Sequence, residues 1–138
     1  MARGDVYLHL NFPYSDGTYG KKYFVIMFEP EESSKEPYLV LKTTSKLKGR
    51  SFNIGCNERS QVFYIPAKNI NVFPENTLIQ LQEIFEFSSE EFLKGSLTDR
   101  TIEYKDTLQE ITNSQLKNCI KKLKEDISVS HYEMITRK

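Results

Sequence analysis

The segment 22–29, KYFVIMFE, constrains the fold of this chain more than any other. Aromatic and β-branched residues fill it, which is typical of a β-strand that is buried on both faces. The stretch 5–12 alternates apolar and polar residues with the period of two expected for a strand with one buried face. Between the two lies a polar loop, 12–22 (FPYSDGTYGKK), which is either an ordinary connection or a functional site.

Further apolar runs predict strands at 38–44, 61–66 and 77–87. Residues 45–60 are polar and contain glycine, which indicates a long loop. The C-terminal third changes character. Ser88 and Glu91 have the spacing of a capping box, so we expect a short helix over Ser88–Lys94 that stops at Gly95.

A short strand is expected within 97–105, followed by an amphipathic helix over Ser114–Ile127. Strands therefore come first and helices last, with no alternation of strands and helices. This order predicts a mainly β fold with α: a small, strongly bent antiparallel sheet or barrel of five to seven strands, with helices packed on it. The length of 138 residues fits one domain, 1–127, followed by a tail, 128–138, without a strong signal.

The alternation also predicts which residues form the core. These are Val6, Leu8, Leu10, Phe24 to Phe28, Leu39, Leu41, Ile79 and Leu81.

Charge and cysteine content limit the classes of function. Lys+Arg and Asp+Glu are both 19, so nucleic-acid or membrane binding would need a local patch. The longest apolar run, 23–28, is too short to span a bilayer. Cys56 and Cys119 lack a CxxC motif or a nearby cluster of histidines, so no zinc site is expected. Two isolated thiols without a signal peptide predict reduced cysteines and a cytoplasmic protein.

Several short motifs appear in one order along residues 2–127. They are RGDVY at 3–7, the polar loop ending in GKKY at 20–23, a threonine at Thr43 in a strand, NTLIQLQEIFEFSSEEF at 76–92, and a closing strand and helix. In this order the chain resembles the MazF/PemK toxins. That resemblance implies an SH3-like barrel and a homodimer. It also implies a cytoplasmic, metal-independent endoribonuclease without a cofactor, which cleaves single-stranded RNA and pairs with an antitoxin protein.

The resemblance assigns roles to residues near the polar loop. Lys22 would stabilise the pentavalent phosphate, and Thr43 would donate a hydrogen bond beside it. Asp16, the only carboxylate in the loop, is the candidate general base, with His9 as the alternative. The candidate RNA-binding residues are Tyr14, Tyr19, Lys21, Thr44 and Gln82.

Some positions depart from the family pattern. Lys22 stands where the family has a catalytic arginine, and Tyr23 where it has proline. Gln82 and Phe85 stand where many members have an acidic residue and an arginine. Lysine keeps the charge but lacks the planar fork that grips a phosphate. The alternative is therefore a non-catalytic RNA- or protein-binding module on the same barrel.

Each candidate residue also has an ordinary structural explanation. Lysines flanking an apolar strand are commonly solvated, and threonine is a common strand residue. Asp16 followed by Gly17 is a turn signal in itself. A dimer would bury surplus apolar residues, for which the candidates are Phe52, Phe63, Phe73 and Phe85.

Overall fold

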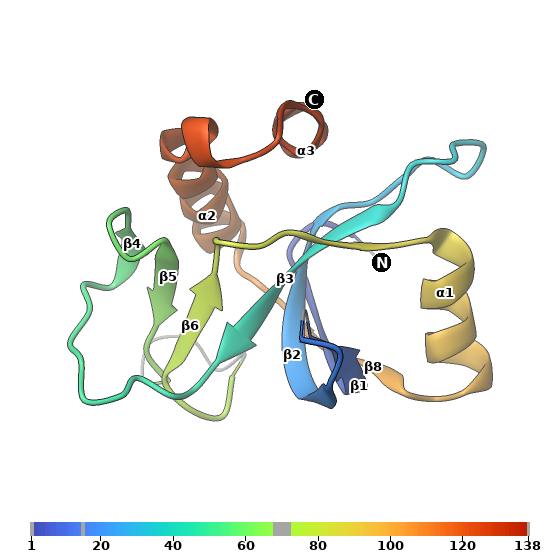
Figure 1. The fold of residues 1–138 in the computed structure, drawn as a ribbon, viewed down its shortest axis with the longest axis horizontal. Helices are drawn as coiled ribbons and strands as arrows, with labels where there is room; N and C mark the ends of the chain where they lie inside the picture. Colours follow the sequence, from blue (N-terminus) through green and yellow to red (C-terminus); the bar gives the residue numbers. More distant parts are fainter. Residues whose placement is uncertain (1, 15, 68–72, 138) are drawn as a thin grey trace.

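The computed structural model describes residues 2–14, 16–67 and 73–137, which form one bent antiparallel sheet and three α-helices (Figure 1). The strands are β1 (Asp5–Pro13), β2 (Tyr19–Phe28), β3 (Tyr38–Thr44), β4 (Gly55–Asn57), β5 (Val62–Ile65), β6 (Thr77–Gln80), β7 (Phe85–Phe87) and β8 (Ile102–Thr107). The helices are α1 (Ser89–Leu93), α2 (Glu110–Lys122) and α3 (Val129–Thr136), with a π-helical turn at Lys94–Thr98 and a 3₁₀ turn at Lys124–Asp126.

The sheet has the strand order β4-β5-β6-β3-β2-β1-β8, and β7 pairs with β3 beside this path. The mainly β class and its antiparallel pairing are as predicted. Within the described residues, no pairing joins β4 to β8, so the sheet is open rather than closed into a barrel.

The segment 77–87 forms two strands instead of the predicted one. β6 pairs with the end of β3, where Thr43 lies opposite Ile79. β7 pairs with the start of β3, where Tyr38 lies opposite Phe87. The chain leaves the sheet between these two pairings, so a single bent strand, β3, joins both parts of the sheet (Figure 1).

Helices α2 and α3 cover one face of the sheet, as Figure 1 shows. Leu116 and Ile120 of α2 and Ile135 of α3 are almost fully buried there. They pack against strand residues that include Val25, Leu39, Leu41, Phe63, Ile65 and Ile79. Phe63 and Phe73 belong to this core, so the prediction that they contribute to an exposed dimer patch is wrong.

Helix α1 covers part of the opposite face, where the core is aromatic. Phe92 of α1 has no exposed surface and stacks on Tyr38 with ring centroids 4.6 Å apart. Its ring also meets Tyr7 edge-on at 5.1 Å. Phe24 and Ile26 of β2 lie in this aromatic cluster, whereas Val25 lies in the other core. The prediction that β2 is buried on both faces is therefore confirmed.

The predicted core is confirmed except at Leu10, whose side chain is 39% exposed. The β1–β2 register shifts between His9 and Phe12. A shift of one residue turns the following side chains to the other face of a strand. Phe12 accordingly joins the aromatic cluster with Tyr7, although simple alternation places it on the face of Val6.

The capping box of α1 is confirmed. Ser88 Oγ accepts the Glu91 N–H at 3.0 Å, and a Glu91 carboxylate oxygen accepts the Ser88 N–H at 3.2 Å. Gly95 does not stop the helix, because the chain continues into the π-helical turn. A side chain at Gly95 would overlap Ile102 of β8, so this glycine permits close packing rather than ending the helix.

The C-terminal helices also differ from their predicted bounds. Helix α2 begins at Glu110 rather than Ser114 and ends at Lys122 rather than Ile127. Helix α3 occupies most of the tail 128–138, where no strong sequence pattern predicts an element. Arg3 donates to the carbonyl oxygen of Ile135 at 2.6 Å, which ties this tail to the N-terminus.

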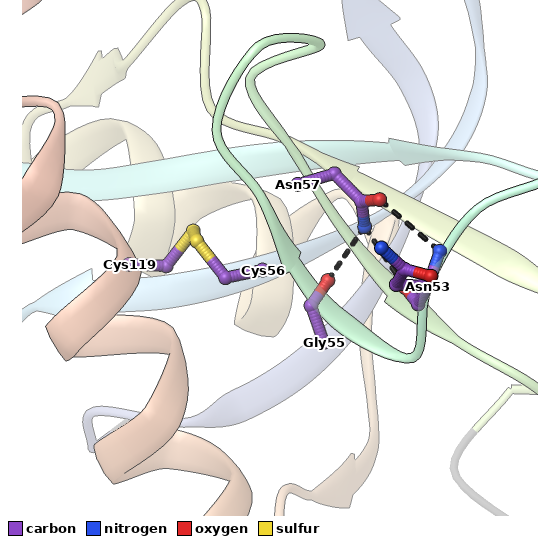
Figure 2. Close-up of a disulfide and its surroundings, with 5 residues drawn as sticks. All are labelled: Asn53, Gly55, Cys56, Asn57 and Cys119. Carbon is purple, nitrogen blue, oxygen red and sulfur yellow. Dashed lines mark hydrogen bonds between the residues drawn. A yellow bond between two sulfur atoms is a disulfide. The ribbon is translucent and has the colours of Figure 1, made fainter.

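The prediction of two isolated reduced thiols is wrong. Cys56 of β4 and Cys119 of α2 form a disulfide, with Cα atoms 5.5 Å apart across a separation of 63 residues (Figure 2). β4 lies inside the segment 45–60 that was predicted to be loop, so nothing local indicates that Cys56 faces α2. No helix in the described part of the chain is long and apolar enough to cross a membrane.

Candidate functional site

Four of the predicted site residues line one pocket of about 340 Å³, which we call the Thr43 pocket. It lies where the ends of β2 and β3 meet the segment before β6. The residues that bear on its chemistry are Lys21, Lys22, Thr43, Thr44, Glu75 and Thr77. The pocket thus combines two cations, several hydroxyl groups and one carboxylate.

Thr43 is the most buried of these groups, with 3% of its surface exposed. Its hydroxyl donates to the carbonyl oxygen of Tyr23 at 3.0 Å, across the β2–β3 pairing. This bond fixes the orientation of the side chain. The hydroxyl oxygen keeps acceptor capacity toward the pocket, but its proton is already used.

Lys22 lies at the border of the Thr43 pocket and belongs to a cluster of lysines. Its Nζ lies 6.0 Å from the centroid of the Tyr14 ring, and Lys42 Nζ lies 5.4 Å from the same ring. Burial lowers the pKa of Lys22, and the charges of Lys42 and Lys46 lower it further. We call Lys22, Lys42 and Lys46 the lysine cluster. An anion bound there would relieve the repulsion among the three charges.

A second pocket, of about 350 Å³, adjoins the first at Thr44, and we call it the Arg50 pocket. Cationic residues of the segment after β3 line it, namely Lys46, Lys48 and Arg50. Its described lining contains no carboxylate. Leu78 and Val62 add an apolar base, and Gln80 and Gln82 add amide groups.

An aromatic wall borders the Arg50 pocket. The Phe52 and Tyr64 rings lie with centroids 6.2 Å apart, and the Arg50 guanidinium lies 5.0 Å from the centroid of Phe52. Arg50 also donates to the Ser60 hydroxyl at 3.0 Å. Rings and guanidinium planes are the groups on which unpaired bases stack.

Strand alternation explains how the two pockets are divided. Lys42 pairs with Phe24 in the β2–β3 register, so Lys42 and Thr44 lie on the face of the aromatic cluster. Thr43 lies between them and points to the opposite face, where Leu8 and Tyr23 line the Thr43 pocket with it. The end of β3 therefore lies between the pockets, and Thr44, its last residue, lines both.

The candidate base Asp16 lies outside the described lining of both pockets. Its carboxylate accepts the Thr18 hydroxyl at 2.6 Å and the Thr18 N–H at 2.9 Å. These bonds lower the pKa of Asp16, the side-chain bond most strongly. Asp16 thus closes a turn, which matches its ordinary structural explanation.

His9, the alternative base, faces Lys22 across the β1–β2 pairing. Burial among the aromatic rings lowers its pKa, so the neutral ring predominates near pH 7. Its Nδ1 accepts the Asn11 N–H at 3.1 Å, which leaves the ring proton on Nε2. In this arrangement the Nδ1 lone pair is occupied by Asn11, so His9 Nε2–H is the group available to its surroundings.

The remaining predicted RNA-binding residues are dispersed. Tyr14 packs against Phe12 and lies under the lysine cluster, and any side chain at Gly20 would overlap its phenol group. Tyr19 is 70% exposed on β2. Gln82 lines the far part of the Arg50 pocket, where its amide donates to the Ser60 carbonyl oxygen at 3.4 Å.

Sequence reasoning missed Glu75, Lys42 and the aromatic wall. Lys42 carried a usable signal, because it stands two residues before Thr44 in a predicted strand and so shares its face. No sequence pattern indicates Glu75 as a site residue, because it lines the Thr43 pocket only when the segment before β6 folds against β2 and β3. Within the described residues, no group of three or more His, Cys, Asp or Glu side chains could hold a metal ion.

Comparison with models of known protein families gives no match for this chain, and comparison with curated proteins gives none either.

Proposed function

We propose that the protein binds single-stranded RNA across the two pockets and cleaves it in the Thr43 pocket, as a toxin of a toxin–antitoxin pair would. One observation carries the proposal: Lys21, Lys22, Thr43 and Thr44 line one pocket, which opens next to a second pocket lined by cations without a carboxylate. A strand of alternating phosphates and bases needs this combination of charge and apolar surface.

The Arg50 pocket suits a nucleotide better than a simple anion. Lys46, Lys48 and Arg50 can neutralise a phosphate, while Phe52, whose ring lies beside Tyr64, offers a face for a base. The amides of Gln80 and Gln82 supply both donors and acceptors, which a base edge requires. An unpaired strand is favoured over a duplex because only unpaired bases can leave the stack to enter such a pocket.

Cleavage without a metal needs a base for the 2′-hydroxyl and a cation for the phosphorane. Glu75 carries the one carboxylate among the described residues that line the Thr43 pocket, so it replaces Asp16 as the proposed base. Lys22 is the proposed stabiliser of the developing charge, and Lys21 holds a neighbouring phosphate. The hydroxyl of Thr44 is the proposed donor in place of Thr43, whose proton is used by Tyr23.

The toxin-like interpretation extends to the assembly of the protein. It implies a homodimer, an antitoxin partner and action in the cytoplasm, with this open sheet in the place of the family's SH3-like barrel. A stable dimer would bury about 1,200–2,000 Å² in total. Exposed Leu97 and Tyr104 near the free edge of β8 are better candidates for that interface than Phe63 or Phe73. Light scattering at micromolar concentration tests this, and a monomer would contradict it.

The second candidate function is binding without cleavage, on the same surface. The use of the Thr43 proton by Tyr23 favours it, as does the lysine in the place of the family's arginine. This module would hold RNA or a protein segment in the groove without reacting with it.

The deciding experiment incubates the purified protein in EDTA with a long single-stranded RNA and detects 2′,3′-cyclic phosphate ends. We expect cleavage to fall about 10²–10³-fold in Lys22→Ala, because one charge stabiliser is lost. Lys22→Arg should keep or increase the rate, since guanidinium grips phosphate with two bonds. Glu75→Gln should lower the rate by about 10²–10⁴ without weakening RNA binding.

The matched control is the double variant Lys121→Ala/Lys122→Ala, which removes the same kind of charge from the exposed side of α2. It should leave cleavage unchanged. Wild-type protein that binds RNA but yields no products would replace the enzyme with the binding module. Wild-type protein that neither binds nor cleaves RNA would overturn both candidates.

A further inference from the structure

The disulfide joins the outermost strand of the sheet to the helix layer. β4 is three residues long and lies at the end of the strand order, where it pairs with β5. Cys56 of β4 is partly exposed, whereas Cys119 of α2 is 1% exposed. So short a strand has few backbone bonds of its own, and the disulfide is the one covalent link that holds it against α2.

The residue after Cys56 connects the disulfide to the wall of the Arg50 pocket. The Asn57 amide nitrogen donates to the carbonyl oxygens of Asn53 and Gly55, both at 2.9 Å. Its amide oxygen accepts the Asn53 N–H at 3.1 Å. Figure 2 shows these bonds beside the disulfide. Asn53 directly follows Phe52, so the wall is linked to β4 through Asn57 and to α2 through Cys56.

We propose that this disulfide is a redox-controlled tether that holds in place segment 45–57, which supplies Phe52 of the aromatic wall and the cations of the Arg50 pocket. Reduction releases β4 from α2, loosens the wall and weakens RNA binding. The RNA part of this inference rests on the proposed function, whereas the loosening of the wall does not.

The chemistry needs a dithiol reductant. One thiolate of the dithiol attacks the sulfur of Cys56, the more exposed residue of the pair, the bond to Cys119 breaks, and the Cys119 thiolate takes up a proton. The second thiol of the reductant then displaces Cys56 as a thiol and closes a disulfide in the reductant. Two electrons and two protons pass to the protein, and the dithiol is oxidised.

The helix core that the disulfide joins is also held together by apolar side chains, so reduction leaves that packing in place. Cys119 lies among Leu116, Ile120 and other apolar side chains of the α2 core, and a free thiol behaves there as a small apolar group. Disulfides in reducing compartments are commonly transient and redox-sensing, so this pair would act in that way in the cytoplasm that the proposed function implies.

The test compares amide hydrogen exchange of the full chain before and after treatment with dithiothreitol. Exchange within 45–57 should rise about tenfold or more on reduction, while β1 and α1 stay unchanged, because opening is local. Cys56→Ser should show the fast exchange with or without dithiothreitol. Asn57→Ala should speed exchange within 45–54 while the disulfide remains intact.

Binding of a short unstructured RNA is measured on the same samples. The tether is supported as a regulator if reduction weakens RNA binding by the wild type. Cys56→Ser should bind RNA weakly both with and without dithiothreitol, so reduction should not change its affinity. Equal affinity of both redox forms overturns regulation. Unchanged exchange within 45–57 on reduction overturns the tether itself. If reduction speeds exchange within 45–57 but neither the oxidised nor the reduced protein binds RNA, the tether is supported and the proposed function is rejected.

Discussion

The two ends of one face of the sheet are covered in different ways. One end contributes mainly to stability, and the other forms the proposed binding pocket. At one end, α1 and the aromatic cluster seal the face, with Phe92 fully buried. At the other end, the same face carries Thr44, Gln80 and Leu78, and the polar segment after β3 lies over it and leaves a pocket. Lys42 stands between the two ends, beside both Tyr14 and Phe85.

The two ends should therefore differ in how strongly a substitution lowers the stability of the protein. The sealed end is packed on all sides, so the loss of an atom there leaves a cavity. The open end is held by a few polar bonds and a disulfide, so it can adapt to a ligand without disturbing either core. Each of the first three of the following predictions breaks one end and leaves the other intact, and the fourth concerns the place where they meet.

The largest effect is expected from Phe92→Ala at the sealed end. It removes a ring that stacks on Tyr38 and meets Tyr7, so the free energy of unfolding should fall by about 3–5 kcal/mol. Denaturant unfolding measures the change. The neighbouring Leu93 is 43% exposed, and Leu93→Ala should cost about 0.5 kcal/mol or less. Equal losses in the two variants would contradict the sealed packing of α1.

Phe52→Ala should have the next largest effect, on RNA affinity at the open end. The loss of one base-stacking ring typically costs about 1–3 kcal/mol of binding free energy. Fluorescence anisotropy with a short unstructured RNA measures it. Ile54 is 67% exposed in the same segment, and Ile54→Ala is the control that should bind normally. Equal losses of RNA affinity in the two variants would indicate that Phe52 supports the structure of its segment and does not stack on a base.

The sequence predicted most of the sealed end, with Phe12 as an exception, because local alternation determines it. The pattern of β2 alone places Phe24 and Ile26 on one face and Val25 on the other, whatever covers them. The capping box at Ser88 likewise depends on four consecutive residues. Features whose cause lies within one segment could therefore be predicted from that segment.

The open end could not be predicted in the same way because distant segments create it. Cys56 meets Cys119 across 63 residues, and no spacing rule indicates that pairing. The break between β6 and β7 arises because two parts of one apolar stretch pair with different ends of β3. Glu75 reaches the Thr43 pocket by the same kind of long-range folding. Of the residues that line the Thr43 pocket, Lys21, Lys22, Thr43 and Thr44 could be predicted from the sequence, whereas Glu75 could not.

Ser88→Ala should have a smaller effect, again at the sealed end. It removes the side-chain acceptor for the Glu91 N–H, which typically costs about 1 kcal/mol of stability. Denaturant unfolding again measures it, and RNA affinity should not change. Ser88→Asp is the matched control, because aspartate can accept the same bond and should restore the stability. No difference between alanine and aspartate would show that α1 does not depend on its cap.

The smallest effect is a pH dependence that arises where the two ends meet, at His9. Burial lowers the pKa of His9 in the folded protein, so the unfolded chain binds the proton more readily. Stability contributed by the neutral ring is therefore fully present above the unfolded pKa of about 6.5 and is lost as the pH falls toward the lower folded pKa.

Denaturant unfolding of the wild type and of His9→Gln between about pH 5 and 8 isolates this contribution as the difference between the two curves. The wild type should lose more stability than the variant as the pH falls, and the curves should run parallel above the unfolded pKa. A difference of the opposite sign would mean that the charged ring is stabilised in the fold. His9 would then belong to the open, anion-binding end of the face and not to the sealed one.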